Sequence, residues 1–247
     1  MWWWPFHILV WTHIATGAVG LVAFWVPVLG RKGGYAHRRW GKVFVASMLA
    51  TGTVAIGMST CTVIDPVGTH PHLADAVLVR GIFGWMMLYL AILTINLAWY
   101  GWLCVQNRTR HAANREWRNL ALQALVTVAA ANCALQGWRI GQPLMIGISI
   151  VGFATAATNL RFLYKARPAR NEYLFEHLKG LVGAGISVYT AFFAFGAVRL
   201  MPQLALNPLL WAVPLTTGLA IIIYYKFDLA RKSRPSLYLP EPAARAG

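Results

Sequence analysis

Residues 5–42 read PFHILVWTHIATGAVGLVAFWVPVLGRKGGYAHRRWGK, and this stretch decides the fold class. Residues 5–29 contain no charged side chain, and a run of that length is long enough to cross a bilayer as a helix. Residues 31–42, which follow at once, contain five Lys or Arg. An apolar run that ends in a short basic loop is typical of a multi-pass membrane protein.

The same pattern continues along the chain. Of the 247 residues, 58% are hydrophobic and 12% are charged, whereas a soluble domain carries about 25% charged residues. We predict an all-α bundle of seven transmembrane helices in one domain, residues 1–230, followed by a short cytoplasmic tail, 231–247, that is Pro- and Ala-rich and disordered. The expected spans lie near 5–29, 43–64, 78–105, 120–138, 144–164, 181–201 and 207–225.

The net charge of +15 is distributed unevenly between the two ends of these spans. Loops 31–42, 106–119 and 161–179 and the tail from Lys226 hold 19 of the 22 Lys and Arg; Arg80, Arg139 and Arg199 lie at the opposite ends. The positive-inside rule then predicts a bacterial inner-membrane protein with its N-terminus outside and its C-terminus in the cytoplasm. Because this rule accounts for the basic loops, the expected partner is the lipid bilayer, and no nucleic-acid partner is expected.

The N-terminal segment is expected to be a retained helix. No basic residue precedes Arg31, whereas a secretory signal peptide begins with a positively charged region. Trp2, Trp3 and Trp4 are expected to lie in the aromatic belt of the outer membrane interface.

His13 is the first candidate site residue, because an ionisable side chain inside a span indicates a functional role by default. Gly17 and Gly20 follow at i+4 and i+7 and share its helix face, whereas His7 is rotated by about 120°. Such a face suits close helix packing, with His13 hydrogen-bonded to a neighbour. The alternative use of this face is to leave space for a flat ligand such as haem, with His13 as an axial ligand.

Three more histidines, His37, His111 and His177, are expected at the basic ends of the spans. One interpretation is a haem b or quinone site. Two imidazoles from different helices, small residues beside the ring and basic groups for the propionates are what a bis-histidine haem needs. The residues of these types are His37, His177, Gly41, Gly180, Arg38 and Arg39.

A metal site of the zinc type is the competing interpretation. A catalytic zinc takes three protein ligands and one water. His37, His111 and His177 supply three imidazoles, and Glu116, Glu172 and Glu176 are expected near the same face. No H-x-x-x-H or H-E-x-x-H spacing occurs, and the three cysteines form no C-x-x-C motif.

The remaining polar residues of the spans indicate helix packing. Asn96, Gln123, Asn132 and Asn159 are expected to form hydrogen bonds between helices. All seven carboxylates are expected outside the spans or at their ends, which argues against a proton-coupled transporter.

The chain resembles uncharacterised bacterial multi-pass membrane proteins that are classed as a domain of unknown function. One matching block has a first-helix His and Gly, His13 and Gly17, followed by an H-R-x-x-G-[RK] loop at residues 37–42. The other block is a late helix with His177, Gly183 and the T-A-F triplet of residues 190–192. An H-x-x-W-M element expected after the third span is present only as HAANREW, around His111. The resemblance implies a multi-helix fold and directs attention to His13, His37 and His177, without implying an activity.

Three function classes therefore stay open. The first is a redox protein that binds haem b or quinone, and the second is a non-catalytic accessory or assembly subunit of a membrane complex. The third is a metal-dependent membrane hydrolase with zinc. The sequence leaves open whether the protein is an enzyme and whether it binds any cofactor.

Overall fold

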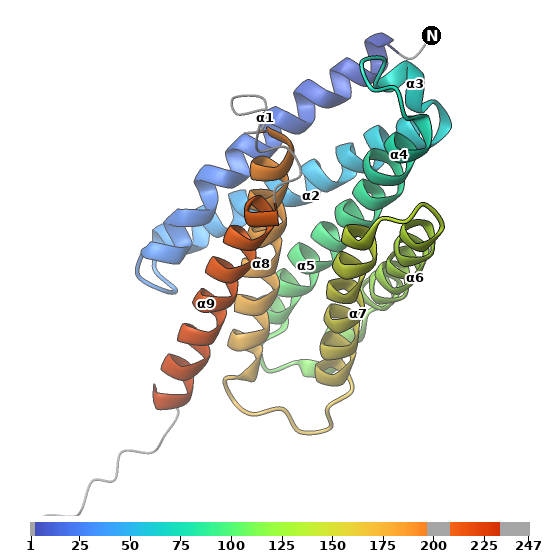
Figure 1. Ribbon diagram of the computed structural model, residues 1–247. Coiled ribbons are helices and arrows are strands. Elements are labelled where there is room, and N and C mark those ends of the chain that lie inside the picture. Colours follow the sequence, from blue (N-terminus) through green and yellow to red (C-terminus); the bar gives the residue numbers. More distant parts are fainter. Residues whose placement is uncertain (1–2, 197–207, 233–247) are drawn as a thin grey trace, which may run out of the picture.

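The computed structural model describes residues 3–196 and 208–232, and within them the chain is helical with no strand. Seven helical segments are long and apolar enough to cross a membrane, so the protein is an all-α polytopic bundle (Figure 1). The predicted positions of Trp2, Arg199 and the tail beyond residue 232 lie outside the described residues, as does the side chain of Trp3. The long helices are α1 (Trp3–Leu29), α2 (Tyr35–Ile64), α5 (Met87–Asn107), α6 (Trp117–Arg139), α7 (Pro143–Leu163), α8 (Glu172–Ala191) and α9 (Pro208–Lys232).

Short helical segments complete the fold. α3 (Pro66–Thr69) and α4 (Ala76–Val79) connect α2 to the π-helical turn η1 (Arg80–Met86), which runs directly into α5. The 3-10 helix η2 (His111–Arg115) joins α5 to α6, and the π-helical turn η3 (Phe192–Gly196) extends α8. We call the end of the bundle that carries residues 30–34, 108–116 and 164–171 the basic end.

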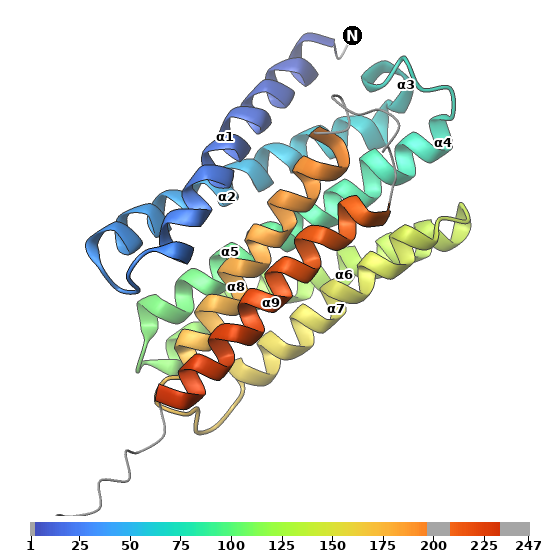
Figure 2. The same ribbon diagram turned by 60° about the vertical axis from the view of Figure 1, so that its left-hand side comes forward.

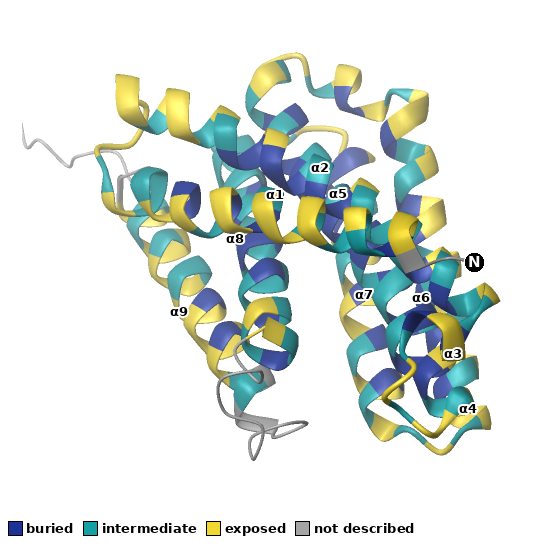
Figure 3. Ribbon diagram, turned by 90° about the horizontal axis from the view of Figure 1, so that it is seen from above, coloured by how far each residue is buried: buried dark blue, intermediate teal, exposed yellow. Residues whose placement is uncertain are grey.

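The helices pack in pairs around α5. α1 lies along α2, α6 along α7, and α9 along α8, while α5 contacts α2, α6 and α8 (Figures 1 and 2). The span that contains α5 is the most buried of these helices: 50% of the residues in its most apolar part are buried. The corresponding share is 17% in α1 and 11% in α9. The exposed residues of α1 and α9 cover their outward faces (Figure 3). In a bilayer these apolar faces would contact lipid, because they are the surfaces that the bundle leaves uncovered.

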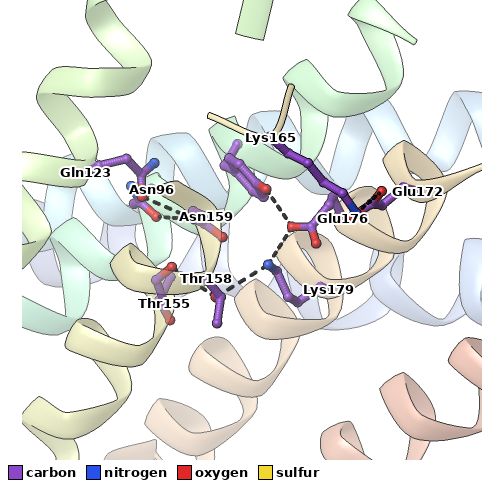
Figure 4. Close-up of polar contacts among 10 residues, drawn as sticks. Asn96, Gln123, Thr155, Thr158, Asn159, Lys165, Glu172, Glu176 and Lys179 are labelled. Atoms are coloured by element: carbon purple, nitrogen blue, oxygen red, sulfur yellow. Dashed lines mark hydrogen bonds and ion pairs between the residues drawn. The ribbon is translucent and has the colours of Figure 1, made fainter. Parts of the chain in front are cut away.

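Buried amides cross-link α5, α6 and α7. The Asn159 side-chain amide donates to Asn96 Oδ1 at 3.4 Å and to Gln123 Oε1 at 3.2 Å (Figure 4). The predicted interhelical role of these three residues is confirmed. It is wrong for Asn132, which accepts a hydrogen bond from Gln136 of its own helix. Buried polar groups need partners, so the three helices are held in one register.

Two helices begin much earlier than predicted. α2 begins at Tyr35, whereas its apolar span was expected from residue 43, and α8 begins at Glu172 rather than near 181. Hydropathy marks only the part of a helix that matches the hydrocarbon layer, while charged first turns can extend beyond it. As a result His37 and His177, expected in loops or at span ends, lie inside helices, where their directions are fixed.

Candidate functional site

His37 is positioned by the tight turn between α1 and α2. Gly33 has a φ of 73°, a backbone conformation that residues with a side chain rarely adopt. This glycine lets the chain reverse direction within the five residues between α1 and α2. The last carbonyls of a helix lack partners within it. Here the Lys32 ammonium donates to Pro27 O at 2.8 Å and to Val28 O, and His37 Nδ1 lies 3.2 Å from Pro27 O. The turn therefore fixes the His37 ring against the end of α1.

His177 is positioned by the crossing of α5 and α8. Its Nδ1 lies 2.8 Å from the main-chain oxygen of Gly101. The two helices approach closely because Gly180 faces Gly101: a Cβ on Gly180 would lie 2.8 Å from both Gly101 Cα and Leu97 O. Gly180, predicted to make space for a cofactor, has that space filled by α5 in the structure.

The structure brings His37 and His177 together. Their ring centroids are 6.4 Å apart, with an angle of 62° between the ring planes, and they come from α2 and α8. A main-chain carbonyl can only accept a hydrogen bond, so Nδ1 carries the proton in each neutral ring. Nε2 then keeps its lone pair. This arrangement, an imidazole oriented through Nδ1 and free at Nε2, is the usual one for a metal-ligating histidine.

A buried ion pair lies beside His177 in sequence and in space. Glu176 is 6% exposed, accepts a 2.5 Å hydrogen bond from the Tyr100 hydroxyl and pairs with Lys179 (Figure 4). Lys179 also donates to Thr158 at 3.4 Å. Because Tyr100 precedes Gly101, this network and the His177 hydrogen bond hold the same stretch of α5. Sequence reasoning identified Glu176 only as a candidate metal ligand and missed Tyr100 and Gly101.

Arg38, Arg39 and Gly41 lie on α2 beside His37. A surface hollow of about 520 Å³ is lined by Arg38, Arg39, Tyr35 and Lys42. Arg39 donates to the Tyr35 hydroxyl at 3.4 Å. Gly41 is one helical turn from His37, and a Cβ there would meet no atom within 4 Å. Gly41 thus leaves open space on the face of α2 that carries His37, whereas the hollow with the cationic groups lies on another face of the same helix.

His13 lies apart from this pair, on the face of α1 that packs against α2. Its Nδ1 is 3.2 Å from Thr51 O. A Cβ on Gly17 would touch the Thr51 methyl group at 3.7 Å, and one on Gly20 would lie 3.1 Å from Ser47 Oγ. The glycine face of α1 is therefore filled by α2. Close packing with a hydrogen bond from His13 is the arrangement that the structure contains.

His111 does not join His37 and His177. Its ring packs edge-on against Phe162 of α7, with centroids 4.7 Å apart, and its Nε2 is buried without a hydrogen-bond partner. Among the described residues, no three His, Cys, Asp or Glu side chains are grouped so that they could hold a metal ion. The predicted zinc site of His37, His111 and His177 is thus not assembled, because His111 lies on η2, which contacts α5, α6 and α7.

The acidic candidates also have other partners. Glu172 forms an ion pair with Lys165 at 2.9 Å and accepts from the Ala169 amide. Glu116 accepts a 3.1 Å hydrogen bond from the Trp99 indole. Both carboxylates therefore stabilise the loops of the basic end.

A histidine that the sequence left unassigned lies at the opposite end of the bundle. The His70 ring lies between Phe6 and Phe83, with centroid distances of 5.7 and 4.6 Å, and its Nδ1 is 3.0 Å from Thr69 Oγ1. Burial, with a smaller contribution from the neighbouring His72, lowers the pKa of His70 to about 4. His70 is therefore neutral at pH 7 and packs as an aromatic ring between α1 and η1.

Comparison with known proteins finds no matching family model, no matching curated protein and no matching solved structure. The seven apolar helices are consistent with an uncharacterised multi-pass membrane protein. The motif-level resemblance stays a prediction, and function has to be argued from the site itself.

Proposed function

We propose that this protein is a membrane-embedded redox protein in which His37 and His177 hold a haem b. The observation that carries the proposal is the imidazole pair, contributed by two helices at the basic end, with ring centroids 6.4 Å apart. Imidazole nitrogens are ligands that haem iron accepts. His37 and His177 are close enough that the two side chains could hold one haem together.

The surroundings of the pair also suit this group. The main-chain oxygens of Pro27 and Gly101 orient the two rings and leave both Nε2 atoms as lone-pair donors. Gly41 leaves open space on the His37 face, and Arg38 is the nearest cationic residue in sequence for a propionate. Haem b bound there would supply one-electron transfer, and a quinone in the bilayer or another membrane subunit would be its partner.

We also propose that the protein lies in the bacterial inner membrane, with the histidine pair near the cytoplasmic surface. In a bacterial inner membrane the positive-inside rule places the basic end, and with it the histidine pair, at the cytoplasmic side. Electron exchange would then occur near that surface.

An accessory subunit without chemistry and a zinc hydrolase are the alternatives. No three potential ligands are grouped among the described residues, so no observation favours the hydrolase. An accessory role predicts a colourless protein and is tested by the same experiment.

The test is the absorption spectrum of the detergent-purified protein, with haem content measured as the pyridine complex. We expect a Soret band and about one haem per chain, lost in His37→Asn and in His177→Asn. Asparagine retains a side-chain N–H near the position of Nδ1 but has no lone-pair nitrogen, so the contact with the carbonyl can persist while ligation cannot.

His111→Asn and His72→Asn are the matched controls and should retain full haem content, with unchanged elution in size-exclusion chromatography. A colourless wild-type protein refutes haem binding. Normal haem content in both His37→Asn and His177→Asn refutes the assignment of the ligands.

A further inference from the structure

A second hollow lies at the basic end, between η2 and the C-terminal end of α7. It measures about 510 Å³, and its lining includes Arg110, Arg115, Lys165, Thr109, Tyr164 and His111. It shares no lining residue with the hollow on α2 that is lined by Arg38 and Arg39. The hollow is therefore independent of the proposed haem site.

Cationic charge dominates the lining of this hollow. Lys165 is paired with Glu172, but no carboxylate forms an ion pair with Arg110 or Arg115 within the described part of the chain. The Arg115 guanidinium lies over the Tyr164 ring, 5.8 Å from its centroid, which orients it. Two guanidinium groups without a carboxylate, beside the hydroxyls of Thr109 and Tyr164, match the chemistry of a phosphate group.

The hollow lies at the level expected for lipid headgroups. α6 begins at Trp117 and ends near Trp138, and both indoles are exposed, as tryptophans at the two interfaces of a membrane are. η2 directly precedes Trp117, so the hollow adjoins one of these interfaces.

α6 follows η2, and α7 ends at Leu163, so both helices lead away from the hollow. The exposed side chains of α6 and α7 include Leu125, Val128, Ile150 and Phe153. Acyl chains could lie on this surface while the phosphate occupies the hollow. A free phosphate ion would make no use of it, so the arrangement favours an amphiphile.

We propose that this hollow binds the phosphate headgroup of an anionic phospholipid, with Arg110 and Arg115 as the principal donors. Basic pockets at the cytoplasmic ends of transmembrane helices are suited to such headgroups. Binding would tie η2 to the end of α7 and stabilise the α6–α7 hairpin against α5.

The test uses the full-length protein and native mass spectrometry after equilibration with equal amounts of phosphatidylglycerol and phosphatidylcholine of identical acyl chains. We expect the wild-type protein to retain about one phosphatidylglycerol per chain. Arg110→Gln combined with Arg115→Gln should reduce the retained fraction about tenfold, while Arg110→Lys with Arg115→Lys, which keeps the charge but loses the forked donors, should give an intermediate loss.

Arg167→Gln combined with Arg170→Gln is the matched control, because it removes the same charge from a neighbouring loop of the basic end outside the hollow. Retention in this control should equal that of the wild type. Equal retention of the two lipids by the wild type, or an equal loss in the control pair, overturns the proposal. Inorganic phosphate is added in a separate arm: displacement of the lipid by phosphate at equal concentration would identify a free phosphate site and overturn the lipid assignment.

Discussion

The contact between Gly180 and Gly101 yields a prediction that separates a packing role from a cofactor role. In Gly180→Ala, the new Cβ would lie 2.8 Å from Gly101 Cα and from Leu97 O, and 2.9 Å from Gly101 N. All three neighbours are backbone atoms, so no side-chain rotation can relieve the contact. An ordinary carbon contact begins near 3.4 Å, and α8 would have to move away from α5 by roughly 0.6 Å.

Such overpacking costs about 1–3 kcal/mol, and the higher helix propensity of alanine offsets up to about 1 kcal/mol. We expect a net loss of about 1–2 kcal/mol in the free energy of unfolding, a factor of roughly 5–30 in the folded-to-unfolded ratio. The measurement is equilibrium unfolding in mixed micelles by sodium dodecyl sulfate, followed by far-UV circular dichroism. The His177–Gly101 hydrogen bond spans the same crossing and should weaken with it.

Gly147→Ala on α7 is the matched control, because a Cβ there would meet no atom within 4 Å. It should leave the unfolding midpoint unchanged or raise it. An unfolding midpoint for Gly180→Ala that equals that of Gly147→Ala would show that the α5–α8 crossing tolerates the extra carbon, and the packing argument would fail.

Two further predictions concern charged and titratable groups. Glu176→Gln leaves Lys179 without its carboxylate and should lower the free energy of unfolding by about 1–3 kcal/mol. Glu172→Gln removes a more exposed ion pair and should lower it by less than about 1 kcal/mol. Equal losses in the two variants would contradict the stabilising role of the buried network. Because the pKa of His70 is lowered to about 4, the unfolded chain takes up a proton below pH 6.5 that the folded chain does not. The free energy of unfolding is therefore at its full value above pH 6.5 and falls as the pH is lowered toward 4. Melting temperatures measured over this pH range should fall less steeply in His70→Asn than in the wild type, and His72→Asn should behave as the wild type. The same pH dependence in the wild type and in His70→Asn would refute the lowered pKa of His70.

The sequence was sufficient to predict the seven spans, because each consists of about 20 apolar residues and the bilayer fixes that length. It was not sufficient to predict where the helices begin. The segment YAHRRWGK reads as a basic loop, yet it forms the first turns of α2. Charged residues at an interface disturb hydropathy without breaking a helix, since water and headgroups solvate them. This difference moved His37 from a loop to a fixed position on a helix.

The glycines show a second limit. Gly17, Gly20 and Gly180 lie on helix faces that the sequence identified correctly as smooth. A smooth face accepts either a neighbouring helix or a flat ligand, and sequence spacing describes only one side of the contact. Helices α2 and α5 fill these faces, and Gly41 alone of the four proposed glycines has open space beside it.

The packing of the helices decides which histidine rings lie close together, and local sequence patterns do not predict that packing. His37, His111 and His177 all lie near the basic end, but η2 packs on α5, α6 and α7, whereas His37 follows the turn that ends α1. The close crossing of α5 and α8 then places His177 within reach of His37. The structural role of these two rings and their proposed role as ligands use different nitrogens: Nδ1 bonds a helix carbonyl, and Nε2 stays free. A hydrogen bond that stabilises the bundle is therefore no argument against ligation, because it fixes the tautomer that ligation requires.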